Sequence, residues 1–259
     1  MVPVSSLITI AICAVLSIAV PILLSWWMVK KYNVKVRIIL IGAGVFVLFA
    51  LVLETILHQV VLKGAIGPTI TGNVWYYALY GGLAAGIFEE TGRFLAMNFL
   101  LKGEPQDAKT AVAYGIGHGG IEMLIIFGVS MIVNLVIAAL INAGQADTIL
   151  SSVPAEAHAQ MQGAFAQFET STPGTFLTGL WERTSAIILQ VGLSVFVWTA
   201  VRKGGKWLWL FPAAILLHFL VDASAVLLMN AVSMVVLETI VCAMAVAVGA
   251  SAVMLAKKL

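Results

Sequence analysis

Two histidines in this sequence each stand four residues before a carboxylate. His118 precedes Glu122, and His218 precedes Asp222. In a helix this interval places the imidazole and the carboxylate on one face. Both pairs fall inside long apolar stretches, where a carboxylate costs roughly 2.5–3.5 kcal/mol if it faces the centre of a bilayer. Side chains this costly indicate polar chemistry within a membrane.

A third segment, E-E-T-G-R, places Glu89 and Glu90 within one helical turn of Arg93. The arginine can therefore reach either carboxylate. Neighbouring residues on a helix point about 100° apart, so we expect only one of the two glutamates to face a site well. Judged from the nearest basic residues, the glutamates and both histidines lie about 13–20 Å inside the cytoplasmic ends of their helices, at about 1.5 Å per residue. Three helices thus bring polar groups to a similar depth.

Two imidazoles with one or two carboxylates form the ligand set of a catalytic zinc ion that keeps an open position. The corresponding ligands here are His118, His218 and Asp222, with Zn²⁺ as the expected cofactor. Such an ion lowers the pKa of bound water toward about 7 and supplies hydroxide. A glutamate then acts as general base, and as acid toward the leaving amine. Without metal, a glutamate and one histidine would take the proton, and the other histidine with Asp222 would stabilise the oxyanion. The spacing leaves both schemes open.

A second polar group contains Glu54, His58, Glu182 and Arg183. From their positions along the chain, all four belong to the outer halves of their spans. We expect Arg183 to pair with Glu54 or Glu182, either as a structural ion pair or at the lining of a substrate entrance. From this group Glu182 and Arg183, together with Glu122 of the His118 pair, are predicted to support the site.

The composition requires these groups to be positioned by membrane helices. The 259 residues are 61% hydrophobic and only 10% charged, with a mean hydropathy of +1.06. Ordinary soluble proteins contain about 25% charged residues. About 20 apolar residues form one helical span. We predict an all-α, polytopic transmembrane helix bundle in the cell membrane, a single domain of residues 1–259 with about seven spans: 5–29, 38–62, 74–101, 110–142, 175–201, 207–228 and 231–256.

The basic residues predict the orientation of these spans. Most of the fourteen follow the first, third, fifth and seventh spans, while the loop 143–174 has no lysine or arginine. The positive-inside rule then places the N-terminus outside and the C-terminus in the cytoplasm. The net charge of +2 reflects this orientation, so no nucleic-acid partner is indicated. Cys13 and Cys242 have no spacing typical of a disulfide framework or a thiolate metal site.

The loop and the fourth span depart from a simple bundle. Residues 143–174 form the predicted extracytoplasmic loop, with a partly helical pattern through Ala155–Phe168. This loop is expected to be either a short amphipathic helix at the outer interface or a plain linker. At about 1.5 Å per residue the fourth span exceeds a 30 Å hydrocarbon core, so it must tilt, break or project. Its glycines predict close helix packing around His118, with Gly128 as a later break point.

The motifs together resemble a known group. E-E-T-G-R, G-H-G-G-I-E, W-E-R and the final H-x-x-x-D, in this order, resemble the CAAX protease and bacteriocin-processing superfamily of intramembrane proteases, and most closely its YhfC branch. The resemblance implies that Glu89 or Glu90 activates water and that Arg93 orients the glutamates. His118, His218 and Asp222 would complete the site. The branch would also have a histidine about eight residues after W-E-R, where this chain has Gln190.

Three functions follow as hypotheses. The leading one is an intramembrane metalloprotease that hydrolyses a membrane-embedded or membrane-delivered peptide, with the lipid bilayer and this substrate as its partners. The second is a proton- or ion-coupled transporter, because carboxylate and histidine chains also form proton relays. The third is a non-catalytic immunity or partner-binding membrane protein. The sequence leaves the substrate and the oligomeric state open.

Overall fold

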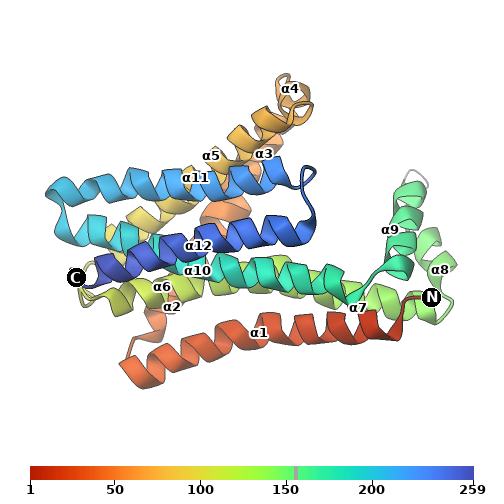
Figure 1. Ribbon diagram of the computed structural model, residues 1–259, viewed down its shortest axis with the longest axis horizontal. Helices are drawn as coiled ribbons and strands as arrows, with labels where there is room; N and C mark the ends of the chain where they lie inside the picture. Colours follow the sequence, from red (N-terminus) through yellow and green to blue (C-terminus); the bar gives the residue numbers. More distant parts are fainter. Residues whose placement is uncertain (155–156) are drawn as a thin grey trace. The chain divides into compact units, whose positions relative to one another are not determined.

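Helices build the part of the chain that the structure describes, which is residues 1–154 and 157–259 of a computed structural model (Figure 1). No strand occurs within these residues, and the predicted all-α, polytopic bundle is confirmed. The elements in chain order are α1 Val4–Tyr32, α2 Val36–Phe46, η1 Val47–Glu54, α3 Thr55–Leu62, α4 Gly67–Thr71, α5 Val74–Leu95, η2 Ala96–Leu100, α6 Ala108–Glu122, η3 Met123–Gly128, α7 Val129–Asn142, α8 Ala146–Ser151, α9 His158–Thr170, α10 Pro173–Lys203, η5 Gly205–Trp209, α11 Leu210–Leu228 and α12 Met234–Ala256.

Six helical stretches in the described chain are long and apolar enough to cross a bilayer. They are Val4–Tyr32, Val36–Leu62, Ala108–Asn142, Pro173–Lys203, Gly205–Leu228 and Met234–Ala256. The remaining predicted span, 74–101, is also helical, as α5 and η2. It stands apart from the six because Glu89, Glu90 and Arg93 are concentrated in its second half. The direction in which the chain crosses the membrane stays a prediction.

Three segments of the spans are π-helical, with η1, η2 and η3 continuing the α-helices that precede them. Segments of this kind occur often at functional sites. Glu54 is the last residue of η1, and η3 begins directly after Glu122. The break expected in the fourth span at Gly128 corresponds to the end of η3. At that point the hydrogen-bonding pattern changes from π-helical to α-helical, and the helix continues as α7.

The chain divides into two compact units by its internal contacts: Met1–Ala19 with Leu124–Trp181, and Val20–Met123 with Glu182–Leu259. The division describes where contacts concentrate and does not test the prediction of a single membrane domain. In the second unit α5 lies along α11, and α2 lies along α6 (Figure 1). Both contacts hold polar side chains in the interior of this unit, which is therefore the one that carries the site.

The contact between α2 and α6 is unusually close because of glycine. A Cβ atom added at Gly117 would lie 2.0 Å from the carbonyl oxygen of Ile39, and one added at Gly42 would lie 2.2 Å from that of Tyr114. Real side chains cannot approach a backbone so closely, so only glycine permits this distance. Small residues allow membrane helices to pack in this way. The predicted close packing around His118 is confirmed.

The first unit contains the predicted extracytoplasmic loop. The helical pattern expected at Ala155–Phe168 is found as α9, although its first two residues lie outside the described chain. Phe165 is 8% exposed and packs in an apolar cluster with Ile10 and Phe176. It is therefore a core residue of this unit. Whether this helix also lies at the outer interface stays a prediction.

Candidate active site

Glu89 and Glu90 are both buried near the end of α5, at 6% and 0% exposure. The expectation that only one of them faces the site stays a prediction, since burial alone does not show which glutamate faces it. Helix α5 contacts α11 on one side and α2 on another, so side chains that diverge by about 100° both remain inside the unit. Each glutamate bonds a different histidine.

Glu89 is held by His118 and Gln190. Its Oε2 lies 2.8 Å from His118 Nε2 and accepts a hydrogen bond of 3.0 Å from Gln190 Nε2. The imidazole of His118 is fully buried and lies edge-on to Phe46, with ring centroids 5.2 Å apart. Its Nδ1 has no hydrogen-bond partner among the described residues. One imidazole nitrogen is thus committed to Glu89, and the other is available.

Glu90 is held by His218 and Arg93. Its Oε1 lies 2.9 Å from His218 Nδ1, and its Oε2 lies 3.4 Å from Arg93 Nη1. His218 Nε2 lies 3.6 Å from Asp222 Oδ2, which is an electrostatic contact too long for a hydrogen bond. The predicted i, i+3 pair of Arg93 with Glu90 is present. His218 therefore lies between two carboxylates, one from α5 and one from its own helix.

Gln190 connects the two glutamate–histidine pairs. Its amide oxygen accepts a short hydrogen bond from Arg93 Nη2, and its amide nitrogen donates to Glu89 and to Glu122, the latter at 3.1 Å. These partners use the oxygen as an acceptor and both N–H groups as donors, so the network fixes the orientation of the amide. The backbone oxygen of Gln190 accepts a further bond of 3.3 Å from Arg93.

Sequence reasoning treated Gln190 only as a departure from a histidine and missed this role. A signal was present: Gln190 lies seven residues after Arg183, and this interval places both on one face of α10.

Arg183 extends the network to the supporting residues. It donates a hydrogen bond of 2.9 Å to Glu122 Oε1 and a short one to Glu182. The predicted pairing with Glu182 is found, and the principal partner from another helix is Glu122. Glu54 pairs instead with His58, at 3.2 Å, and His58 Nδ1 contacts the hydroxyl of Tyr80 at 2.8 Å. The second predicted group is thus divided between two sets of direct contacts.

All the residues that the sequence singles out as catalytic, metal-binding or supporting belong to this network within the second unit. The structure brings them together without assigning their roles. Buried charges require partners of opposite charge or good hydrogen bonds, and the network supplies these to each carboxylate. Its members are Glu89, Glu90, Arg93, His118, Glu122, Glu182, Arg183, His218 and Asp222, joined through Gln190.

The donor types in the network fit a divalent metal. Histidine ligands of metals usually donate their second ring N–H to a carboxylate, and His118 and His218 each have one nitrogen engaged by a glutamate. The unpartnered Nδ1 of His118 is a further potential ligand atom. As the side chains stand in residues 1–154 and 157–259, no three acidic, imidazole or thiol groups are arranged to hold an ion.

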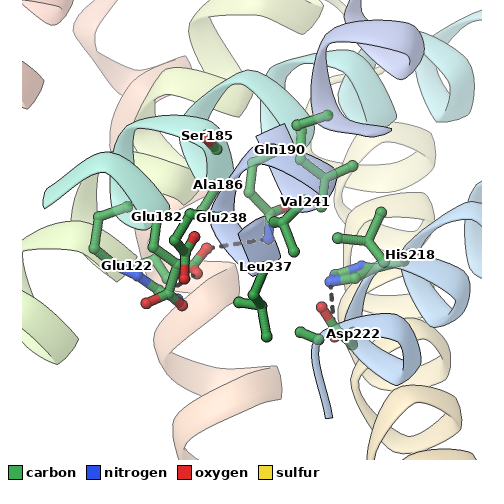
Figure 2. Close-up of a pocket in the computed structure, with 15 residues that line it drawn as sticks. Glu122, Glu182, Ser185, Ala186, Gln190, His218, Asp222, Leu237, Glu238 and Val241 are labelled. Atoms are coloured by element: carbon green, nitrogen blue, oxygen red, sulfur yellow. Dashed lines mark hydrogen bonds and ion pairs between the residues drawn. The ribbon is translucent and has the colours of Figure 1, made fainter. Parts of the chain in front are cut away.

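A cavity adjoins the network in the same unit (Figure 2). Its volume is about 90 Å³, and Gln190, His218 and Asp222 are among the residues that line it. The side chain of Asp222 is 36% exposed. Water can thus approach groups that contact both glutamates.

The sequence profile of the YhfC intramembrane metalloprotease family matches residues 16–246. The chain belongs to this family. Every member of the polar network lies inside the matched range, and membership in the YhfC family makes the chain a multi-pass membrane protein. Placement of the YhfC family within the wider CAAX superfamily stays a prediction.

A curated relative in the YhfC family supports the same conclusion. Over 228 residues the chain is 34% identical to the "Uncharacterized membrane protein YhfC" of Bacillus subtilis (strain 168). The alignment covers 88% of this chain and 86% of that protein. No solved structure matches the chain. The family description indicates a membrane protease that uses a metal, and the relative adds no substrate or catalytic residue.

Proposed function

We propose that the chain is an intramembrane endopeptidase that hydrolyses a membrane-embedded or membrane-delivered peptide. The observation that carries this proposal is the buried pair of Glu89 and His118, 2.8 Å apart and linked through Gln190 to an open cavity. A bilayer excludes bulk water, so hydrolysis inside it needs a polar cavity that admits both water and an unwound peptide. The cavity beside the network supports the proposal because it provides space for water next to Gln190 and His218.

Glu89 is the proposed general base. Both of its hydrogen bonds within the described chain use Oε2, so Oε1 is available to take a proton from water. The water oxygen then attacks the carbonyl carbon of the scissile bond. As the carbon–nitrogen bond breaks, Glu89 returns the proton to the leaving amine. His118 and Gln190 hold the carboxylate in place during both transfers.

The second pair has a different role in each of two alternative schemes. Without metal, His218, which lines the cavity and lies between Glu90 and Asp222, would donate a hydrogen bond to the developing oxyanion. Arg93 fixes the orientation of Glu90 through their ion pair. In the metal-assisted scheme, His118, His218 and Asp222 are instead the proposed ligands of a zinc ion. When bound, zinc supplies Lewis acidity that polarises the carbonyl and makes water easier to deprotonate.

The metal content of histidine variants tests the zinc proposal directly. We expect about one equivalent of zinc in the full-length protein purified in detergent, the stoichiometry of a mononuclear site. His118→Ala and His218→Ala should each lose it, whereas His158→Ala, in the first unit, should retain it. Elemental analysis measures the content, and gel filtration confirms that each variant is folded. Equal zinc in all four proteins would exclude these ligands.

A further inference from the structure

The cavity beside the network has an acidic end. Figure 2 shows Glu122, Glu182 and Glu238 gathered on one side of the cavity, and His218 with Asp222 on the other. Glu238 comes from α12 and takes no part in the catalytic proposal. This end of the cavity therefore contains a carboxylate that the hydrolytic proposal does not use.

Glu238 is a buried carboxylate that lines this cavity, and one of its oxygens has no partner. The residue is 3% exposed, and its Oε2 makes no hydrogen bond within the described part of the chain. Native proteins rarely leave a buried polar atom unpaired, and an exception calls for an explanation such as a bound water, a bound ion or a catalytic role. An unpaired carboxylate oxygen in a cavity calls for a donor, and a cation is the strongest one.

Carboxylates outnumber basic side chains among the described residues that line this end of the cavity. Arg183 is the arginine at this end of the cavity, and it is already engaged by Glu122 and Glu182. Asp222 faces His218, at the other end. A positive group that enters the cavity would therefore meet Glu238 Oε2, and it would share the partly exposed Glu182 with Arg183. The side chain of Glu182 is 41% exposed, which leaves it accessible from the mouth.

The remaining walls of the cavity are apolar. Leu189, Val221, Leu237 and Val241 line it, and Figure 2 shows Leu237 and Val241 between its two polar ends. Lysine and arginine side chains place an aliphatic stem along apolar surface and a charged head in a polar environment. Apolar walls that lead to an acidic end match this shape and charge.

We propose that this cavity is a specificity subsite that receives the side chain of a lysine or arginine in the substrate, with Glu238 and Glu182 binding its charged head. This inference rests on the proposed peptidase function for the identity of the ligand. The subsite adjoins the scissile position because Gln190 and His218 line the cavity and also contact Glu89 and Glu90. A basic residue next to the cleaved bond is thus the recognised feature.

Binding of matched peptides to full-length Glu89→Gln protein in detergent tests the subsite without cleavage. The probes are fluorescein-labelled leucine peptides with lysine, arginine, acetyl-lysine or norleucine at the central position. Fluorescence anisotropy gives each Kd. We expect the lysine and arginine peptides to bind at least about tenfold more tightly than the two uncharged ones, as is typical of a desolvated charge pair.

Two substitutions test whether Glu238 and Glu182 cause the preference for lysine and arginine peptides. Glu238→Gln and Glu182→Gln, each added to the Glu89→Gln background, should reduce it to about twofold or less, the effect of a lost charge partner. Glu169→Gln is the matched control, because Glu169 lies in the first unit and pairs with the N-terminus. Gel filtration checks that each variant is folded, and the accessible Glu182 carries the test if Glu238→Gln fails to fold.

Equal affinity for all four peptides, no saturable binding, or a preference that survives both substitutions would overturn the subsite. The peptidase proposal fails separately. If the wild-type protein binds lysine peptides selectively but cleaves none, the subsite stands and the hydrolytic function falls. Cleavage without any preference for a basic residue would support the peptidase function and overturn the subsite.

Discussion

At the scale of single residues, the spacing of charged groups predicted which side chains meet but not how they pair. His118 and Glu122 stand at i, i+4, yet His118 contacts Glu89 on another helix, and Glu122 contacts Gln190 and Arg183. Contacts between helices depend on rotations about helix axes that no local pattern encodes. A buried charge takes whichever partner gives the best geometry, and this depends on the whole bundle.

The first residue-scale prediction tests Glu89 as the general base. Glu89→Gln removes the proposed base but keeps the size of the side chain and can still bond Gln190. We expect the cleavage rate to fall by about 10²–10⁴-fold, the usual contribution of general base catalysis. Mass spectrometry of peptide fragments, with zinc content measured alongside, checks this. Full cleavage by Glu89→Gln would transfer the base role to another residue.

A second residue-scale prediction concerns Gln190. Gln190→Leu leaves Glu89, Glu122 and Arg93 without hydrogen bonds that they now make. Each buried polar group left unpaired costs about 1–3 kcal/mol, so the melting temperature in detergent should fall by several degrees. Gln167→Leu, at an exposed position of α9, is the control and should change it little. An unchanged Tm for Gln190→Leu would show that water replaces the amide.

At the scale of elements, the helices followed from apolar length, and their local irregularities did not. The spans are long apolar runs, and such runs must form helices in lipid because every backbone group needs an internal partner. The π-helical segments η1 and η3 have no sequence signature, since they depend on how neighbouring helices pack. The glycines of α6 were informative because only close backbone contact explains so many in one helix.

The element-scale prediction uses the contact between α2 and α6. Gly117→Ala places a Cβ against the backbone of Ile39, which cannot give way unless the helices separate. We expect a large loss of thermal stability, and loss of zinc as His118 moves away from Glu89. Gly44→Ala on α2 is the matched control, because a Cβ there meets no atom within 4 Å. It should be neutral or stabilising by up to about 1 kcal/mol.

The two glycine variants are compared by thermal unfolding in the same detergent. A Gly117→Ala protein as stable as the control would mean that α2 and α6 are not in close contact in solution. A stable Gly117→Ala protein that nonetheless loses zinc would point instead to a local effect on His118.

At the scale of the whole molecule, the orientation in the membrane rests on the distribution of lysine and arginine. The loop 143–174 lacks both, whereas α10 ends in Arg202 and Lys203. The sequence can predict which side a loop occupies because membrane insertion responds to loop charge. It cannot predict that the loop folds into α8 and α9 with Phe165 in an apolar core, because that depends on contacts distant in sequence, such as Ser6 with Ser171 at 2.8 Å.

The last prediction tests this orientation with single cysteines in intact cells. After Cys13 and Cys242 are replaced by alanine, Thr170→Cys on α9 should react with a membrane-impermeant maleimide added outside. Lys203→Cys should react only after permeabilisation, because the positive-inside rule places the end of α10 in the cytoplasm. Labelling is read as a mass shift on a gel, with the cysteine-free protein as background. The reverse pattern would invert the predicted topology, and with it the side of the membrane from which the specificity subsite is reached. Labelling of both positions in intact cells would show that α10 does not cross the bilayer, and the polar network could then no longer be an intramembrane site.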